Sequence, residues 1–352
     1  MTVETMTAMA RVLTILERGI PDRMPFFLPV TMHGAPACGL SIEEYFSGPE
    51  LIIEAQLHFQ RRFGHDALAG YTFAAREAEA FGQPPIYYTD GPPNAGAPCV
   101  REFADIDRLR PPRILDCPGL QSSLAVQRGL KAAVGETIPI IGLALSPFSL
   151  PVMQLGFDAY LRLMHEDEPR FLRLMEINAA FCVDWINTQL AAGATTVVFY
   201  DPVGSSTIVS DDLYQRLCLP VEREVVAQAN GPLVAHFAGA SALSRVDALC
   251  SLGFPIVCVS TFEDLAEAKV VCKGKIALGG NLNAITMRNW DSATAEAEIR
   301  SAIRKGGPGG GFLLTDNHGE IPFQVPLAVL DTIAATVHRE GGYPLQTSAD
   351  SQ

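Results

Sequence analysis

Short apolar runs alternate along this chain with longer segments in which apolar residues recur every three or four positions. The short runs have the length and composition of buried strands, and the longer segments have the spacing of helices that bury one face. The apolar runs are centred near residues 26, 68, 141, 197, 234, 257, 277 and 313. This alternation predicts an α/β fold with eight strands, a (β/α)8 or TIM barrel, and fits a doubly wound sheet less well.

Two segments depart from the alternation of strands and helices. Residues 2–19 form an amphipathic pattern before the first apolar run, which predicts a helical extension at the amino terminus. Residues 83–98 are rich in proline and aromatic residues without a helical period, which predicts an inserted hairpin or lid near the barrel mouth. No polar linker divides the chain, so we expect a single domain over residues 8–341 and a flexible tail over 342–352.

The composition narrows the classes of partner. Hydrophobic residues make up 48% of the chain and charged residues only 18%, which indicates a folded protein with a large core. This low charged fraction also fits a surface that a second subunit covers, and a homodimer is the expected form by analogy alone. The net charge of −13 argues against nucleic acid or an anionic membrane as a partner, because phosphate binding depends on clustered lysine and arginine.

The cysteines and the amino terminus indicate a reducing compartment. The eight cysteines are scattered, and no two have the C-x-x-C spacing. The first residues do not have the pattern of a signal peptide, and no apolar run approaches the roughly 20 residues that cross a membrane. We therefore expect a cytoplasmic protein with free thiols.

Polar residues follow many of the predicted strands, where a barrel binds its ligands. The positions selected in this way are His33, Glu77, Asp201, His236, Asn281, Asp316, His318 and Glu320. Several of them lie in the stretch 311–322, which could instead be a loop that only caps the following helix. Glu77 could line a pocket or lie on a solvated edge. The glycine-rich stretch 307–311 precedes a strand instead of following one, so it fails the structural test for a dinucleotide-binding loop.

His236 and His318 are the most informative pair, because each follows an apolar strand. Two imidazoles with a carboxylate such as Asp201 or Glu320 could hold Zn²⁺ with an open position. The same groups could act as proton donors or acceptors near neutral pH. The alternative for either histidine alone is a buried imidazole without a functional role.

Seven segments, taken together, resemble the uroporphyrinogen decarboxylase superfamily in order and spacing. They are Arg18–Pro25, Gly142–Leu150, Asp201–Ser206, His236–Gly239, Asp264–Ala268, Gly280–Leu282 and His318–Pro322. The resemblance covers about residues 8 to 340. It implies a (β/α)8 barrel with its cleft at the carboxyl ends of the strands.

The chain departs from the decarboxylases of this superfamily where they bind substrate. Those enzymes carry an Arg-Gln-Ala-Gly-Arg segment after the first strand, whereas residues 30–35 contain no arginine here. Their pyrrole-binding aspartate falls near Phe73 and their tyrosine near Met153, and only their Gly-His-Gly histidine has a counterpart, His318. A substrate with many carboxylates needs cations to offset desolvation, so we do not expect decarboxylation of uroporphyrinogen.

A second branch of the superfamily, the corrinoid-linked methyltransferases that include coenzyme M enzymes, is more similar. Residues 40–45 and 77–82 resemble its members. The members that activate thiols hold zinc through His-x-Cys and Gly-Cys-Gly, which read here as His236-Phe-Ala and Asn-His318-Gly. Because both cysteines are missing, the resemblance implies a methyl donor of the ether or amine type, with zinc held through the two histidines as one option.

The sequence therefore predicts a methyltransferase, or demethylase, that moves a methyl group between a small methylated substrate and a corrinoid (cobalamin-type) cofactor on a partner protein. The expected catalytic residues are His318, Glu320 and Asp201, and the expected metal ligands are His236 and His318. The expected substrate-binding residues are His33, Glu77, Phe73, Met153, Asn281 and Asp316. The alternatives are a decarboxylase-like lyase on a small substrate and a non-catalytic barrel that binds a corrinoid or tetrapyrrole.

Overall fold

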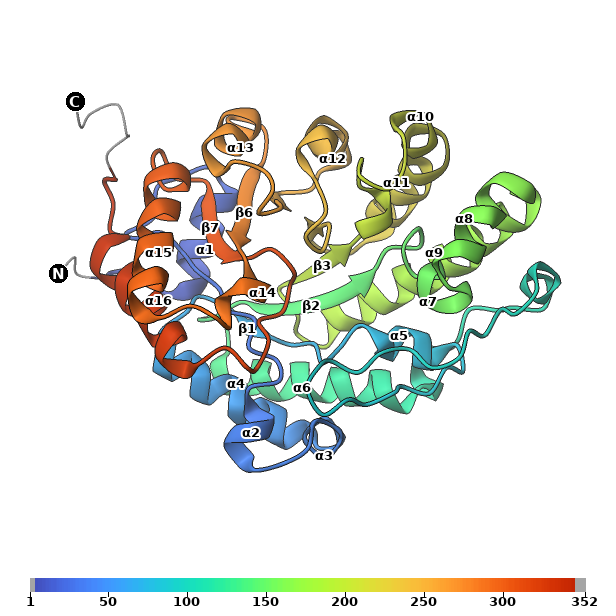
Figure 1. Cartoon of the computed structure of the whole chain (residues 1–352), viewed down its shortest axis with the longest axis horizontal. Helices are drawn as coiled ribbons and strands as arrows, with labels where there is room; N and C mark the ends of the chain where they lie inside the picture. Colours follow the sequence, from blue (N-terminus) through green and yellow to red (C-terminus); the bar gives the residue numbers. More distant parts are fainter. Residues whose placement is uncertain (1–3, 346–352) are drawn as a thin grey trace.

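The computed structural model describes residues 4–345 and contains one parallel sheet whose strands follow the order of the chain. The strands are β1 (Leu68–Ala69), β2 (Ile140–Leu145), β3 (Thr196–Tyr200), β4 (Leu233–His236), β5 (Ile256–Cys258), β6 (Ala277–Leu282) and β7 (Phe312–Asp316). The sheet curls, and helices cover its outer face (Figure 1). The predicted α/β barrel class is confirmed.

The extended segment 24–30 takes the eighth position, between β7 and β1. The Phe27 N–H donates to the carbonyl of Leu314 at 2.8 Å, and the Asp66 N–H donates to the carbonyl of Phe26 at 2.8 Å. The segment therefore bonds on both sides, but it forms only an isolated bridge and not a ladder. The two prolines in the segment explain this difference from the predicted strand near residue 26, because proline has no N–H to donate.

Helices connect successive strands and form the outer layer. The helices up to β3 are α1 (Ala8–Leu16), α2 (Gly34–Cys38), α3 (Ile42–Ser47), α4 (Pro49–Phe63), α5 (Ala75–Ala80), α6 (Pro118–Val134), α7 (Pro151–Leu155), α8 (Phe157–Glu166) and α9 (Glu168–Ala191). Those after β3 are α10 (Asp211–Leu213), α11 (Leu219–Gln228), α12 (Val246–Leu252), α13 (Leu265–Cys272), α14 (Ala284–Met287), α15 (Ser292–Gly306) and α16 (Leu327–Glu340). A π-helical turn, Tyr214–Cys218, precedes α11. Across residues 4–345, no helix combines the length and apolar character needed to cross a membrane.

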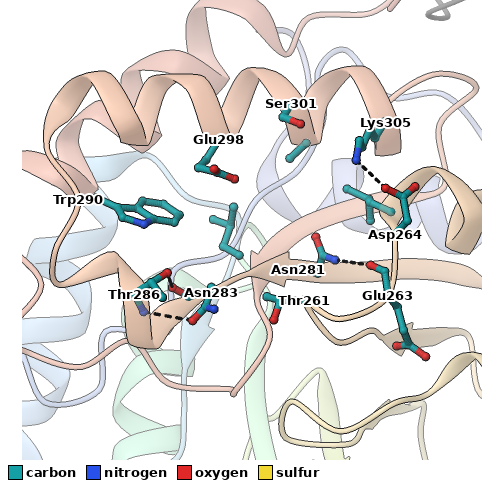
Figure 2. Close-up of a pocket in the computed structure, with 13 residues that line it drawn as sticks. Thr261, Glu263, Asp264, Asn281, Asn283, Thr286, Trp290, Glu298, Ser301 and Lys305 are labelled. Carbon is teal, nitrogen blue, oxygen red and sulfur yellow. Dashed lines mark hydrogen bonds and ion pairs between the residues drawn. The ribbon is translucent and has the colours of Figure 1, made fainter.

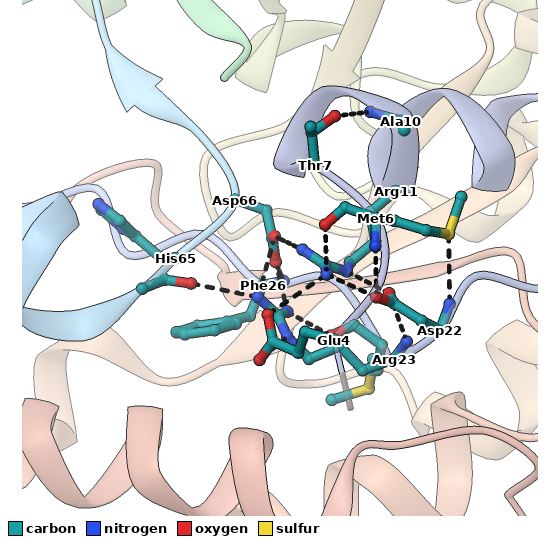
Figure 3. A network of polar contacts seen from close by, with 12 residues as sticks. Glu4, Met6, Thr7, Ala10, Arg11, Asp22, Arg23, Phe26, His65 and Asp66 are labelled. Atoms are coloured by element: carbon teal, nitrogen blue, oxygen red, sulfur yellow. Dashed lines mark hydrogen bonds and ion pairs between the residues drawn. The ribbon is translucent and has the colours of Figure 1, made fainter. Parts of the chain in front are cut away.

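The predicted amino-terminal extension is the helix α1, which a buried polar network attaches to the barrel (Figure 3). The guanidinium of Arg11 donates to Asp66 at 2.6 Å and to Asp22 at 2.7 Å. Arg23 donates to the other carboxylate oxygen of Asp66, also at 2.6 Å. Because Arg11 is only 2% exposed, these ion pairs hold α1 against the amino-terminal end of the barrel.

The segment 83–98 forms the predicted hairpin. Ile86 and Asn94 exchange two backbone hydrogen bonds of 2.8 and 3.0 Å in an antiparallel bridge. The amide of Gln83 donates to the carbonyl of Met153 at 2.8 Å, which holds the base of the hairpin against α7. The hairpin therefore lies beside helices that follow the carboxyl ends of β1 and β2.

The carboxyl-terminal residues that the structure describes are packed against the barrel. The hydroxyl of Tyr343 donates to the carbonyl of Gly307 at 2.9 Å, and the Tyr343 N–H donates to the carbonyl of Asp22 at 3.1 Å. The predicted flexible tail therefore does not begin at residue 342. The rest of that segment, residues 346–352, lies outside the described residues.

Candidate active site

A cavity of about 320 Å³ lies inside the barrel and extends from α1 to the carboxyl ends of the strands. Met9, Val12 and Leu16 of α1 line its lower end, and apolar strand residues such as Val198 and Val234 line its walls. Most barrels of this class fill their interior with layers of branched side chains. Within the described residues, no lysine or arginine lines this cavity, so its walls carry no positive side chain.

Polar side chains at or just after the carboxyl ends of four strands line the upper end of the cavity. These are Tyr71, Tyr200, His236, Thr315 and Asp316. Tyr200 and His236 occupy paired positions on β3 and β4, and their ring centroids are 4.5 Å apart. Burial lowers the pKa of His236 to about 3, and the nearby charge of His318 acts in the same direction. The His236 ring is therefore neutral at neutral pH.

The backbone after β4 determines which nitrogen of His236 carries the proton. The Ala238 N–H donates to His236 Nδ1 at 2.9 Å. Ala238 has a φ of +48°, in the left-handed region, so the chain turns sharply at this point. Because Nδ1 accepts a hydrogen bond, the single proton of the neutral ring belongs on Nε2. His236 Nε2 is buried and has no partner among the described residues, so it is an unused donor in the cavity wall.

This tautomer does not suit a zinc ligand. A histidine that binds zinc through Nε2 carries its proton on Nδ1 and donates it to a carbonyl or carboxylate, whereas Nδ1 of His236 faces an N–H group. In the described part of the chain, one set of three potential ligand side chains has all its ligating atoms within 4.8 Å, and it comprises Asp201, Cys218 and Glu222. It includes neither His236 nor His318, so these two histidines do not fit the zinc site of the resemblance.

The loop after β7 closes over the rim of the cavity. Asp316 Oδ2 accepts the N–H groups of His318 and Gly319 at 2.7 and 2.8 Å, and the hydroxyl of Tyr71 donates to the Gly319 carbonyl at 2.8 Å. A side chain at Gly319 would place its Cβ 1.5 Å from the hydroxyl oxygen of Tyr200, so only glycine fits there. Asp316 Oδ1 is buried and has no hydrogen-bond partner in the described part of the chain, and burial raises the pKa of this carboxyl group.

Glu320 is the titratable carboxyl group at this rim. Burial raises its pKa to about 7, a hydrogen bond from the hydroxyl of Thr31 opposes the shift, and the charge of Asp316 adds to it. A group with this pKa exchanges protons near neutral pH. His318 lies at the same rim, because a Cβ at Gly239, in the loop after β4, would come within 2.9 Å of His318 Nδ1. The structure thus brings His236, Asp316, His318 and Glu320 to one end of the barrel.

Asp201 lies at the end of β3, but its side chain is not in the cavity lining. Its Oδ1 accepts the hydroxyls of Ser146 and Ser149, the latter at 2.6 Å, and its Oδ2 accepts the Cys218 thiol at 3.4 Å. Glu222 of α11 adds a second buried carboxyl group beside it, and the pKa values of both groups are raised by burial. The predicted catalytic Asp201 is therefore placed between the sheet and the helical layer.

Glu77 and Phe73 also lie outside the barrel cavity. Glu77 is 1% exposed and accepts the N–H of Leu145 at 2.9 Å, and burial raises its pKa well above the usual range. Phe73 packs against Phe46 with ring centroids 5.1 Å apart. Met153, on α7, is partly buried and packs against the main core.

His33 and Asn281 occupy two further environments. His33 directly precedes α2 and faces Phe59 at a centroid distance of 6.0 Å, and burial lowers the pKa of His33 to about 4. Asn281 donates from Nδ2 to the carbonyls of Ser260 and Glu263, both at 3.0 Å. It lines a separate polar cavity of about 340 Å³ between β6 and α15 (Figure 2). Neither residue lines the cavity that holds His236.

Two tyrosines of the cavity rim are not among the predicted site residues. Tyr71 and Tyr200 each end an apolar run, which is typical of buried strand residues, although their hydroxyls lie beside the loop after β7. The alternation of side chains along a strand could have identified Tyr200. Val198 and Tyr200 are two residues apart, and both side chains face the cavity. Asp201, the next residue, therefore faces the opposite side of the sheet.

Known proteins resemble this chain in sequence and in fold. Uroporphyrinogen decarboxylase from Myxococcus xanthus is 28% identical over 301 residues, which cover 83% of this chain and 84% of that protein. The enzyme of the same name from Tolumonas auensis is 26% identical over 306 residues, which cover 83% of each.

Solved structures show the same fold at lower identity. A methyltransferase from Methanosarcina mazei superposes with a TM-score of 0.84 at 19% identity, covering 95% of this chain and 99% of its own. A putative vitamin-B12-independent methionine synthase from Listeria monocytogenes gives 0.52 at 16% identity, covering 90% and 95%. The uroporphyrinogen decarboxylase (URO-D) family matches residues 7–340, and this chain therefore belongs to that family.

Proposed function

We propose that this member of the URO-D family is a methyltransferase that moves a methyl group between a small methylated substrate and a corrinoid carried by a partner protein. The similarity in fold to the Methanosarcina methyltransferase over nearly its whole length supports the proposal. A corrinoid bound at the barrel mouth would supply the metal centre that accepts the methyl group. The chain itself supplies the cavity, the hydrogen-bond donor and the proton.

One observation carries the proposal: an apolar cavity without cations ends in a few polar groups. A porphyrinogen with several carboxylates would need positive partners to offset the loss of hydration. The cavity lining offers none among the described residues. Its volume of about 320 Å³ lies at the low end of the roughly 300–1,000 Å³ of small-molecule sites. A small, largely apolar methyl donor with one polar atom matches this site.

The tautomer of His236 favours an ether donor over an amine donor. The Nε2–H group can donate to the lone pair of an ether oxygen, whereas a methylammonium ion has no lone pair to accept it. A cation would also lose its hydration in this cavity, where Asp316 is the one carboxylate in the lining among residues 4–345. We therefore place the ether oxygen at His236 Nε2 and the organic group in the apolar part of the cavity.

The proton balance assigns a role to Glu320. When the bond between the oxygen and the methyl group breaks, its electron pair stays on the oxygen, where negative charge develops; a bound corrinoid would supply the acceptor for the methyl group. The hydrogen bond from His236 Nε2 strengthens with that charge. The carboxyl group of Glu320, with a pKa of about 7, gives its proton to the oxygen, so the organic product leaves as an alcohol or phenol. Asp316 holds the loop that carries Glu320 in place.

The proposal is tested by mixing the purified protein with reduced cobalamin and a panel of methyl ethers, methylamines and methyl thioethers. A methyl ether that converts the spectrum of the reduced corrinoid to that of its methylated form supports methyl transfer. Release of carbon dioxide from a porphyrinogen, without any methyl transfer, would support a decarboxylase-like lyase instead. Corrinoid binding without turnover of any donor would indicate a non-catalytic binding barrel.

A further inference from the structure

A third cavity, of about 260 Å³, lies at the amino-terminal end of the barrel, opposite the candidate active site. The end of α1, the end of α13 and the starts of β6 and β7 surround it. Four cationic residues line it, namely Arg18, Lys269, Lys273 and Lys275. No carboxylate is among its lining residues in the described part of the chain, although acidic residues outnumber basic ones by 39 to 26 in the sequence.

Lys269 is the innermost of these cations and has no counterion. Its ammonium group is half-buried and donates to the carbonyl of Gly310, and within residues 4–345 it forms no ion pair. Burial lowers the pKa of Lys269 to about 8. Taking an ammonium group out of water without a negative partner is costly, so charged groups in such positions are normally paired. The position of Lys269 therefore indicates an anion that completes the site.

The other cations surround the opening of the cavity. Arg18 and Lys273 are exposed, and neither forms an ion pair with another described residue. Arg18 instead donates to the carbonyl of Lys275 at 3.2 Å, which holds its guanidinium beside α13 and β6. Lys275 differs from the other three cations, because its ammonium group pairs with the exposed Asp247 at 2.7 Å. Three of the four cations thus remain available for a bound anion.

The glycine-rich stretch before β7 supplies backbone donors to the same cavity. Gly309, Gly310 and Gly311 have φ values of +75°, +70° and +64°, a left-handed turn that other residues rarely adopt. Successive N–H groups in turns of this kind form concave surfaces that bind anions. The N–H groups of Gly309 and Gly311 have no hydrogen-bond partner among the described residues, and a Cβ at either position would meet no atom within 4 Å.

We propose that this cavity, defined by Lys269, Lys273, Arg18 and the turn 309–311, binds the phosphate group of a small molecule or inorganic phosphate. Several cations and free backbone N–H groups around one pocket match a tetrahedral dianion. The site lies at the end of the barrel opposite His236 and uses none of the residues assigned to methyl transfer, so it stands or fails independently of the proposed function.

The full-length protein is titrated with inorganic phosphate and with a nucleoside monophosphate at constant ionic strength, and binding is followed by calorimetry. We expect saturable binding that Lys273→Gln weakens about tenfold, the loss of one charge-assisted contact, and that Lys269→Met abolishes. Arg223→Gln is the matched control, because Arg223 is an exposed arginine of α11 outside the cavity lining. It should leave the affinity unchanged.

The outcomes separate the sources of phosphate and decide the proposal. Tighter binding of the monophosphate, with displacement of inorganic phosphate, identifies a phosphorylated small molecule as the ligand. Equal affinity identifies the phosphate group alone. Binding that fails to saturate, or that falls equally in the Arg223 control, overturns the site. If Lys269→Met does not fold, Arg18→Gln combined with Lys273→Gln, both on exposed side chains, carries the same test.

Discussion

Replacing His236 by phenylalanine tests whether its Nε2–H group acts in the reaction. Phenylalanine keeps an aromatic ring against Tyr200, where the centroids are 4.5 Å apart, and removes both ring nitrogens. The change therefore removes the unused donor in the cavity wall. It also leaves the Ala238 N–H, which donates to Nδ1 at 2.9 Å, without its acceptor.

The two consequences have separate magnitudes. A hydrogen bond to a charged group contributes about 1.5–3 kcal/mol, so losing the donor to the developing charge should lower kcat/KM about 10- to 150-fold. The unpaired N–H should lower the free energy of unfolding by about 1–3 kcal/mol. His236→Asn separates them, because its side-chain oxygen can accept the Ala238 N–H while its shorter amide does not reach the Nε2 position. We expect this variant to keep most of the stability and still lose activity.

The assay is demethylation of the best methyl ether from the donor panel, followed spectrally, with denaturant unfolding and zinc analysis of the same samples. Full activity in the His236→Phe protein would refute the role of the donor. One equivalent of zinc in the native protein, lost in both variants, would refute the assignment of the proton to Nε2. It would show that the ring binds metal in solution, against its hydrogen bond to the Ala238 N–H.

Three further changes test other parts of the structure. The carboxyl group of Glu320 has a pKa of about 7 and donates its proton only when protonated, so activity should fall as the pH rises above about 7. Glu320→Gln should remove this limb of the pH–rate profile. A limb that is unchanged in the variant would belong to another titratable group. Arg11→Ala should lower the free energy of unfolding by about 1.5–3 kcal/mol in denaturant melts, because it removes a buried charged donor from Asp66 at 2.6 Å and leaves Asp66 paired with Arg23. A change below about 1 kcal/mol, typical of exposed pairs, would contradict this. Gly319→Ala should displace the loop after β7 and lower activity, because its Cβ would overlap the Tyr200 hydroxyl. Adding Tyr200→Phe should not restore activity, because the Cβ would still lie 2.5 Å from Cζ of the ring and residue 319 has a φ of +89°. Full recovery in this double variant would show that the hydroxyl alone blocks the side chain.

The fold could be predicted because burial imposes a strong pattern on the sequence. Strands covered on both faces read as apolar runs, and seven of the eight predicted runs are strands of the sheet. The run at 24–30 occupies the expected position but bonds irregularly, since hydrogen bonding depends on N–H groups that its prolines lack. The prediction of a flexible tail from residue 342 does not hold for residues 342–345. Tyr343 contacts Gly307, and a contact between residues so distant in sequence leaves no local pattern from which it could be predicted.

The candidate site was harder to predict, because a polar residue at the end of a strand can face either side of the sheet. Tyr200 faces the cavity, so Asp201, the next residue, faces the helical layer and bonds to Ser149. The same uncertainty applies to Glu77, whose side chain bonds to the backbone of β2. Local sequence does not report the Ala238 hydrogen bond that determines the tautomer of His236, because that contact depends on the turn after β4.

The helix α1 separates two properties of the barrel cavity. The polar groups of the candidate active site lie at one end of the cavity, and α1, which precedes every strand in the sequence, lines the other end. Exchanging Met9 or Leu16 for a smaller or larger residue would lengthen or shorten the cavity without changing His236, Asp316 or Glu320 at its other end. The size of the molecule that the cavity admits could therefore be changed at the amino-terminal helix, separately from the polar groups of the candidate active site.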